Sequence, residues 1–168
     1  MKIEKIFFDM DGVLADFERG VRELCGIEPP AQDTQPPGAD MFMWDRIREV
    51  EHFYDKLKVM PGAKEMFDTL YGKYGNRCEI LTGIPKPDKR IENAKEDKIR
   101  WIRRLFSEDM VVNVVYKAEK PNYCTGKGCV LIDDLGKTVQ AWEEIGGTGI
   151  LFVSAEETLK RIREIEEL

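Results

Sequence analysis

The feature of this sequence that most constrains its fold is a series of short apolar runs separated by amphipathic helical patterns. Near-continuous apolar runs of about four to eight residues are typical of strands covered on both faces. Strands that alternate with helices indicate an α/β fold with a mainly parallel sheet. The predicted strands are Ile3–Asp9, Cys78–Thr82, Val111–Tyr116, Cys129–Asp133 and Gly149–Val153.

Amphipathic segments fill the spaces between these strands. In Gly62–Tyr74 the apolar residues recur at three- and four-residue spacing, which is the period of a helix with one buried face. The last segment opens with Ser154 and Glu157, the spacing of a capping box. The segment Lys86–Lys98 is highly charged, and we expect it to be solvated. The predicted helices are Gly62–Tyr74, Ala94–Phe106, Thr138–Ile145 and a C-terminal helix that starts at Ser154.

Residues 16–60 do not fit the alternation of strands and helices. Asp16–Gly26 and Trp44–Leu57 have helical patterns, and the proline-rich segment 28–38 lies between them. Such a segment cannot form regular helix or a central strand. We therefore expect a small helical cap inserted after the first strand. The predicted domains are a core of residues 1–15 and 61–168 and a cap of residues 16–60.

Composition narrows the classes of function. The 168 residues are 42% hydrophobic and 35% charged, which is ordinary for a globular domain. The net charge of −6 is unlike that of a general nucleic-acid binder, so polymeric nucleic acid is not an expected partner. No apolar run approaches the roughly 20 residues that span a bilayer. The N-terminus also lacks the apolar stretch of a signal peptide. We therefore expect a cytoplasmic protein that does not bind membranes.

The four cysteines lack the ligand spacing of a zinc site.

Polar side chains close three of the predicted strands. Asp9 and Asp11 follow the first strand, Thr82 ends the second, and Asp133 and Asp134 lie at the end of the fourth. The carboxyl ends of parallel strands meet at one edge of the sheet, where ligands bind in open α/β folds. A carboxylate there can act as a covalent nucleophile, and a second carboxyl can act as general acid and then as general base. Taken alone, the Asp9–Asp11 pair also fits an Asx turn at a strand end.

The combined set of groups is suited to a phosphate group and Mg²⁺. Magnesium prefers oxygen ligands and usually binds through one or two carboxylates, phosphate oxygens and waters. Without the ion, clustered carboxylates would repel one another and the phosphate. The sequence therefore predicts a magnesium-dependent site for a small phosphorylated substrate.

The order of these motifs resembles that of a known group of enzymes. DMDGVLADF, LTG, a downstream lysine and LIDD match, in order, the four motifs of the haloacid dehalogenase superfamily of phosphatases. This resemblance spans residues 2 to 153 and implies a Rossmann-like three-layer core with strand order 3-2-1-4-5. It also implies magnesium-dependent phosphotransfer through an aspartyl-phosphate. By this resemblance Asp9 is the nucleophile, Asp11 the acid and base, and Thr82 and a lysine hold phosphate. The implied Mg²⁺ ligands are Asp9, the backbone carbonyl of Asp11, and Asp133, Asp134 or both.

The lysine of this set has more than one candidate. Lys117 and Lys120 both follow the third predicted strand, and Lys127 lies in a glycine-flanked turn. We favour Lys120, because it begins the stretch that leads to the fourth strand. A lysine at that place would offset the crowded negative charge and hold the phosphoryl group as a point charge.

A narrower resemblance concerns the substrate. MDGVLADFE, LTGIPK, EDKIRWIRRLF and LIDD resemble segments of the 5'(3')-deoxyribonucleotidase family, which removes phosphate from nucleoside monophosphates under a helical cap. The resemblance implies that Lys86 contacts the phosphate or its neighbourhood. Two departures leave the substrate open: Gly83 replaces a hydroxyl residue, and the order of Ile84 and Pro85 is exchanged. The alternatives are a phosphatase for a sugar phosphate or another metabolite, and a non-catalytic domain that binds a phosphorylated partner.

The cap is expected to select the substrate. Phe42 and Trp44 follow the proline-rich segment, and either could stack on a planar base. The competing interpretation, which we favour, is that both pack the small core of the cap. His52 is the only histidine, and we expect it at the surface or at the edge of the core rather than in catalysis.

Overall fold

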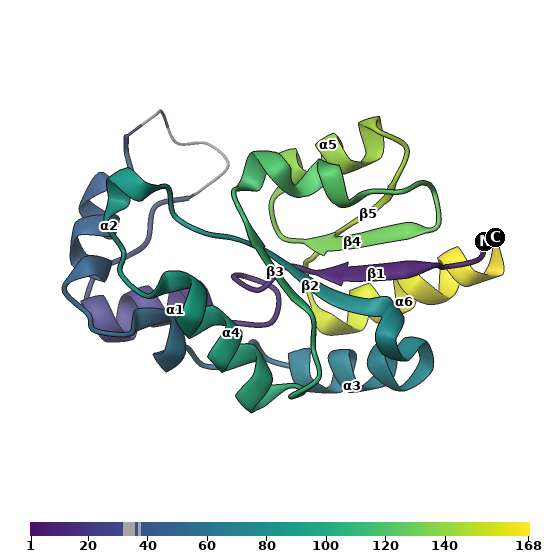
Figure 1. Ribbon diagram of the computed structural model, residues 1–168, viewed down its shortest axis with the longest axis horizontal. Coiled ribbons are helices and arrows are strands. Elements are labelled where there is room, and N and C mark those ends of the chain that lie inside the picture. The colour runs from purple at the N-terminus through teal and green to yellow at the C-terminus, as the bar shows by residue number, and fades with distance from the viewer. Residues whose placement is uncertain (32–35, 37) are drawn as a thin grey trace.

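The computed structural model of the protein describes residues 1–31, 36 and 38–168. Its five described strands form one sheet in which every neighbouring pair is parallel and the order is β3-β2-β1-β4-β5 (Figure 1). The predicted α/β class and strand order are therefore confirmed, and each strand overlaps the apolar run that predicted it. The strands are β1 (Lys5–Phe8), β2 (Cys78–Gly83), β3 (Val112–Val115), β4 (Cys129–Asp133) and β5 (Thr148–Leu151).

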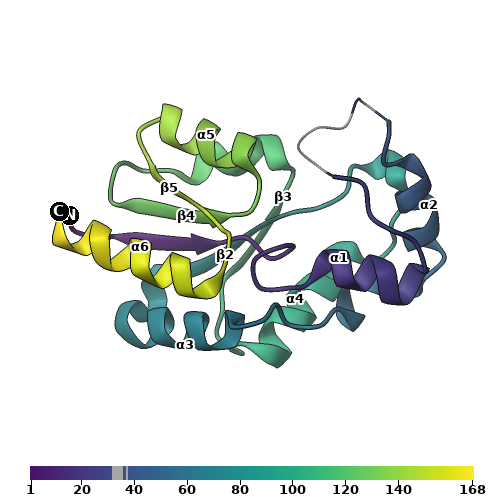
Figure 2. The ribbon, with the colours of Figure 1, turned by 180° about the vertical axis from the view of Figure 1, so that it is seen from behind.

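Helices cover both faces of this sheet. Alternate strand residues point to opposite faces, as the pleat requires. Phe7 and Leu131 pack around Trp142 on one face, whereas Phe8 and Ile132 belong to the larger core on the other. Figures 1 and 2 show the resulting three layers, with α5 on one side of the sheet and three helices on the other. The helices are α5 (Gly136–Glu144) and, opposite, α3 (Ala63–Tyr74), α4 (Ala94–Leu105) and α6 (Ala155–Glu167).

In the described part of the chain, no helix has both the length and the apolar composition needed to cross a bilayer.

A helical segment lies beyond the carboxyl edge of the sheet, on the side away from the chain termini (Figure 1). It contains α1 (Phe17–Gly20), which continues as a π-helical turn over Val21–Cys25, then α2 (Met41–Arg48) and a 3-10 turn over Phe53–Lys56. The proline-rich segment 28–38 falls partly outside the described residues.

The prediction of one continuous helix over Trp44–Leu57 is wrong. Helix α2 ends at Arg48, and His52 adopts a left-handed conformation with φ of 53°, which a right-handed helix cannot contain. The chain therefore changes direction before the 3-10 turn. This change buries Phe53 and Tyr54, whose exposed fractions are 2% and 1%.

The prediction that Lys86–Lys98 is solvated is also wrong at its C-terminal end. Asp97 and Lys98 are 1% and 0% exposed, because this face of α4 packs against the 3-10 turn of the cap segment. His52 Nδ1 lies 2.9 Å from Asp97 Oδ1, and the indole of Trp101 donates to the carbonyl of Leu57 at 2.7 Å. Charged side chains thus occupy a buried helix face, which apolar periodicity alone does not reveal.

Candidate active site

The loop after β1 brings two aspartates to the carboxyl edge of the sheet. The amide of Asp9 still donates to the carbonyl of Ile132 in β4 at 2.9 Å, so Asp9 remains fixed to the sheet. The chain then turns sharply at Gly12, which has φ of +85°. A Cβ at Gly12 would lie 2.1 Å from Asp134 Oδ2, so this turn can approach the β4 loop only with glycine. The loop therefore places Asp9 and Asp11 beside Asp134.

Lys120 lies at the centre of the acidic group. It is 2% exposed, and its Nζ donates to Asp9 Oδ1 at 3.0 Å and to Asp133 Oδ2 at 2.7 Å. Burial opposes the charged form, but the carboxylates of Asp9 and Asp133 raise the pKa of Lys120 above its usual value. Lys120 is therefore a fixed positive charge between the two aspartates.

The other two lysine candidates lie elsewhere. Lys117 is exposed and lines the rim of the cavity described below, with its side-chain stem packed across Gly83. A Cβ at Gly83 would lie 3.1 Å from the Lys117 Cγ. Glycine at this position, where the resembling family has a hydroxyl residue, therefore leaves room for the stem of Lys117. Lys127 is not among the described residues that line the cavity.

Three carboxyl groups crowd together with an excess of negative charge. One oxygen from each of Asp9, Asp133 and Asp134 lies within 4.8 Å of the others. Burial, followed by the charges of Asp9 and Asp133, raises the pKa of Asp134 to about 9. Burial and the charge of Asp9 raise the pKa of Asp133 to about 6, although Lys120 acts in the opposite direction. Lys120 alone does not neutralise this group, and an all-oxygen donor set of this kind suits a hard divalent cation.

The two neighbouring aspartates of β4 differ in their hydrogen bonds. Asp133 Oδ1 accepts from the amide of Leu135 at 2.9 Å, and its Oδ2 accepts from Lys120. Both oxygens of Asp133 are therefore engaged by protein donors, whereas Asp134 lies directly against Gly12 at the edge of the site.

One buried lysine beside the site is not among the residues predicted from the sequence. The Nζ atom of Lys98 lies 2.8 Å from Asp11 Oδ2 and 3.0 Å from Thr82 Oγ1, and both Lys98 and Thr82 are 0% exposed. A signal was present, since Lys98 lies four residues after Ala94 and three before Trp101, on the face of α4 that is buried. The charge of the surrounding segment obscured it.

A cavity of about 550 Å³ opens above the acidic group. Asp9, Asp11, Lys120 and Asp134 line its inner part, where β1 and β4 end. Apolar side chains that include Phe17, Met43, Trp44 and Tyr54 also line it, together with Gly83, Ile84, Pro85, Lys86, Lys89 and Lys117.

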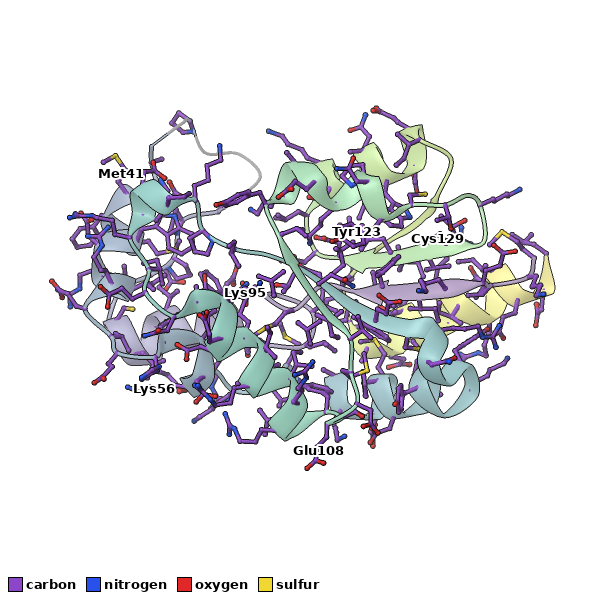
Figure 3. All side chains as sticks on the ribbon, viewed as in Figure 1. Met41, Lys56, Lys95, Glu108, Tyr123 and Cys129 are labelled. Atoms are coloured by element: carbon purple, nitrogen blue, oxygen red, sulfur yellow. The ribbon has the colours of Figure 1, made fainter. Side chains whose placement is uncertain are left out.

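The structure separates the two aromatic candidates of the cap. Trp44 lines the cavity, with its indole donating to Asp40 Oδ2 at 2.7 Å and its ring 6.3 Å from that of Phe17. Phe42 is 63% exposed and is absent from the described lining, so neither expectation fits it: it does not pack the core of the cap, and it does not line the cavity. The reason is the helical rotation of α2: Met43 and Ile47 are buried, whereas Met41 and Phe42 are exposed. Figure 3 labels Met41 on the outer side of α2, away from the sheet.

Comparisons with known proteins bear on the fold of the chain. No family model matches the chain. The human mitochondrial 5'(3')-deoxyribonucleotidase is 24% identical over 162 aligned positions, which cover 84% of this chain and 68% of that protein. The L-2-haloacid dehalogenase of Xanthobacter autotrophicus superposes with a TM-score of 0.52 at 16% identity, over 95% of this chain and 81% of that one. The chain has the haloacid dehalogenase fold. A haloacid dehalogenase-like hydrolase from Streptococcus pneumoniae superposes with the same TM-score of 0.52 at 14% identity, over 88% of this chain and 83% of that one.

The haloacid dehalogenase fold explains why residues so far apart in the sequence meet at one edge. Asp9 follows β1, Thr82 is the last residue but one of β2, and Asp133 ends β4. These three strands are neighbours in the order β2-β1-β4. Lys120 arrives from the 3-10 segment Lys117–Tyr123 between β3 and β4. The resemblance that the motifs indicated is thus confirmed at the level of the superfamily fold.

Proposed function

We propose that this chain is a divalent-cation-dependent phosphomonoesterase that works through an aspartyl-phosphate on Asp9. One observation carries the proposal: Asp9 lies within a crowded carboxyl cluster that binds a buried lysine, and a second aspartate, Asp11, lies beside the same cavity. A site that only bound phosphate would gain nothing from a buried, protonatable carboxyl two residues from the first. That pairing supports turnover over simple binding.

The chain's own groups account for each proton and bond of the reaction. A carboxylate oxygen of Asp9 attacks phosphorus, and the bond between phosphorus and the leaving oxygen breaks. Asp11, as a carboxylic acid, gives its proton to that oxygen, so the product leaves as an alcohol. A water molecule then attacks the phosphorus of the aspartyl-phosphate and gives a proton to the Asp11 carboxylate. Phosphate departs, and Asp9 returns to its free form.

Burial suits Asp11 to this double role. It raises the pKa of Asp11, while the nearby Lys98 acts in the opposite direction. A carboxyl held above its ordinary pKa carries a proton more readily near neutral pH, as a general acid must. Lys120 lines the cavity and can hold an oxygen of the phosphoryl group, whereas Thr82 is fully buried and is not among the described lining residues.

The residues present fit a divalent cation. Asp9, Asp134 and the backbone carbonyl of Asp11 are its proposed ligands. Asp133, whose two oxygens already accept protein hydrogen bonds, is better placed to orient Lys120. When bound, a cation such as Mg²⁺ supplies positive charge against the negative charge that develops on the phosphoryl oxygens.

A nucleoside monophosphate is the proposed substrate class. The cavity of about 550 Å³ lies within the range of small-ligand sites, roughly 300–1,000 Å³. Its wall carries Phe17, Trp44 and Tyr54, and aromatic faces of this kind can stack on a base. The similarity to a protein named as a deoxyribonucleotidase supports the same choice. Lys86 and Lys117 at the rim add positive charge toward an anionic substrate.

The test is an assay of purified protein with p-nitrophenyl phosphate, deoxyribonucleotides carrying 5'- or 3'-phosphate, sugar phosphates and 2-chloropropionate. We expect phosphate release that requires Mg²⁺, is lost in excess chelator and is fastest with a nucleotide. Asp9→Asn is the inactive variant, and Asp109→Asn at an exposed position is its matched control.

Each other outcome contradicts a defined part of the proposal. Chloride release without phosphate release would make the chain a dehalogenase. Phosphate release in excess chelator would exclude the cation. Tight binding of phosphate esters with no turnover would leave a binding domain, and fastest turnover of a sugar phosphate would replace only the substrate class.

A further inference from the structure

Lys98 is a buried charged side chain whose position the proposed chemistry does not yet explain. It lies in α4, outside the Lys120 group, and its exposed fraction is 0%. Its Nζ donates to Asp11 Oδ2 at 2.8 Å, to Thr82 Oγ1 at 3.0 Å and to the carbonyl of Gly83 at 2.6 Å. An ammonium group has three donor hydrogens, so all three are used. A lysine is rarely buried this completely without a specific set of partners.

The two oxygens of Asp11 have different surroundings. Oδ2 accepts the ammonium of Lys98, whereas Oδ1 is buried and has no hydrogen-bond partner among the residues that the structure describes. A buried carboxyl oxygen without a partner is costly, and Asp11 lines the cavity, so a group bound there can supply the missing partner. The oxygen that faces a cationic donor is the poorer place for a proton. Any proton that Asp11 exchanges is therefore carried on Oδ1.

The hydroxyl of Thr82 is oriented in the same way. Oγ1 accepts a hydrogen from Lys98 at 3.0 Å, and its own hydrogen is directed toward the carbonyl of Gly83, 3.5 Å away. Thr82 lies one residue before the end of β2, is fully buried and is not among the described residues that line the cavity. One ammonium thus orients a carboxyl and a hydroxyl.

We propose that Lys98 is the positioning residue of the acid–base step: it holds Asp11 by Oδ2 so that Oδ1 exchanges the proton with the leaving oxygen. This inference rests on the proposed phosphomonoesterase function. Lys98 does not touch the reacting atoms. It acts through Asp11, whose Oδ2 it holds.

The cap segment holds Lys98 in place. The Tyr54 ring centroid lies 4.5 Å from Nζ, so the ring covers the ammonium and contributes a cation–π contact. On one side along α4, Asp97 is bound by His52, and on the other Trp101 donates to Leu57. These contacts span successive turns of one helix, which restricts movement of Nζ relative to Asp11.

The proposed role of Lys98 predicts that the loss of activity on its removal depends on how basic the leaving oxygen of the substrate is. An aryl phosphate such as p-nitrophenyl phosphate releases a weakly basic oxygen and needs little protonation, whereas a nucleotide or other alkyl phosphate releases a strongly basic one. General acid catalysis is worth about 10²- to 10⁴-fold in rate. The ratio kcat/KM covers only the steps up to departure of the leaving group. It therefore isolates proton donation by Asp11 from its later role as base.

We expect Lys98→Met to lower kcat/KM for an alkyl phosphate at least tenfold more than for p-nitrophenyl phosphate. Hydrolysis of the aspartyl-phosphate also needs Asp11, so this second step should be slow in the variant. The variant should therefore release a burst of nitrophenol equal in amount to the enzyme, followed by slow turnover. The matched control is Lys95→Met, an exposed lysine on the same helix, labelled at the start of α4 in Figure 3, which should change neither measurement.

A double-mutant cycle separates positioning from a merely structural role. The quantity compared is the ratio of kcat/KM for the alkyl phosphate to kcat/KM for p-nitrophenyl phosphate. If Lys98 acts through Asp11, this ratio is the same in the double variant Lys98→Met, Asp11→Asn as in the single variant Asp11→Asn. Should Lys98→Met fail to fold, Lys98→Gln replaces it, because glutamine can still hydrogen-bond at the same place without a charge. The same ratio then decides the result.

The opposing outcomes are distinct. Equal losses for alkyl and aryl substrates in a folded variant, or an additive effect in the double mutant, would overturn the role of Lys98 while leaving a phosphatase. Absence of phosphatase activity in the wild-type protein would instead overturn the proposed function itself.

Discussion

Replacement of Asp134 by asparagine is expected to stabilise the metal-free protein while abolishing its activity. The carboxyl of Asp134 is half-buried beside Asp9 and Asp133, and burial followed by their charges raises its pKa from an ordinary 3.8 to about 9. Between these values the folded protein keeps a proton at Asp134 that the unfolded chain releases. Stability of the metal-free protein therefore falls as pH rises from about 4 to about 9.

The size of the effect follows from this pKa difference. A pH of 7 lies about three units above the ordinary pKa of 3.8 that Asp134 has in the unfolded chain. Each unit of difference is worth about 1.4 kcal/mol in the free energy of unfolding. The upper bound on the cost is thus about 4 kcal/mol, and about 2–4 kcal/mol is expected because neighbouring groups relax. Asparagine has the shape of the protonated carboxyl and can still donate a hydrogen bond toward Asp9, but it does not carry this cost. For a domain of this size the gain corresponds to a rise in Tm of about 5–15 °C.

The assay is thermal unfolding of chelator-treated protein at pH 4 and pH 7, with and without added Mg²⁺. Asp134→Asn should raise Tm strongly at pH 7 and only slightly at pH 4, because pH 4 is close to the ordinary pKa of 3.8 and the unfolded chain still keeps much of the proton there. Mg²⁺ should stabilise the wild-type protein and have little effect on the variant, since a ligand raises Tm only where it binds the folded state. The exposed Asp109→Asn is the control. An equal gain at both pH values would show that packing rather than charge is responsible, and no gain at pH 7 would refute the crowding argument.

Three further predictions concern single side chains. Asp9→Asn should lower kcat/KM by a factor on the order of 10⁴ or more with the fold intact by circular dichroism, because it removes the proposed nucleophile but not its volume. Lys120→Met should destabilise the metal-free protein by about 3–5 kcal/mol in denaturant unfolding, since it leaves buried carboxylates without their cation, whereas Lys117→Met at the exposed rim should cost less than about 1 kcal/mol. Trp44→Leu should lower nucleotide kcat/KM by about five- to 150-fold relative to p-nitrophenyl phosphate, and Phe42→Leu should not; equal losses on both substrates for Trp44→Leu would mean that Trp44 only packs the cap.

The strands and the ends of the strands could be predicted from the sequence because they depend on local patterns. A run such as Cys129–Asp133 is apolar on both faces, and an aspartate at its end can only lie at the carboxyl edge of a parallel sheet. Polar residues at the ends of several strands then indicate one shared site, and this inference does not depend on how the helices pack. For this reason the sequence pattern alone is enough to indicate Asp9, Thr82 and Asp133.

The cap and the buried face of α4 could not be predicted in the same way, because charge there is compensated by distant residues. Asp97 has the sequence neighbours of a solvated residue, and its burial depends on His52 in the cap segment. The end of helix α2 is equally non-local: nothing in the pattern of Trp44–Leu57 requires a break, and the left-handed His52 is fixed by the burial of the aromatic residues that follow it.

The pairing of two aspartates with two different lysines gives two carboxyl groups of one loop different surroundings. Asp9 and Asp11 are the same residue type in the same turn, yet Asp9 is bound by Lys120, 111 positions away, and Asp11 by Lys98, 87 positions away. Lys120 also binds Asp133, which keeps Asp9 within the charged cluster, whereas Lys98 lies under an aromatic ring and leaves one Asp11 oxygen without a partner among the described residues. Different surroundings are what divide nucleophile from acid in paired carboxylates. In the proposed mechanism α4 and the segment before β4 would make that division, and a change in either should alter one proposed role without the other.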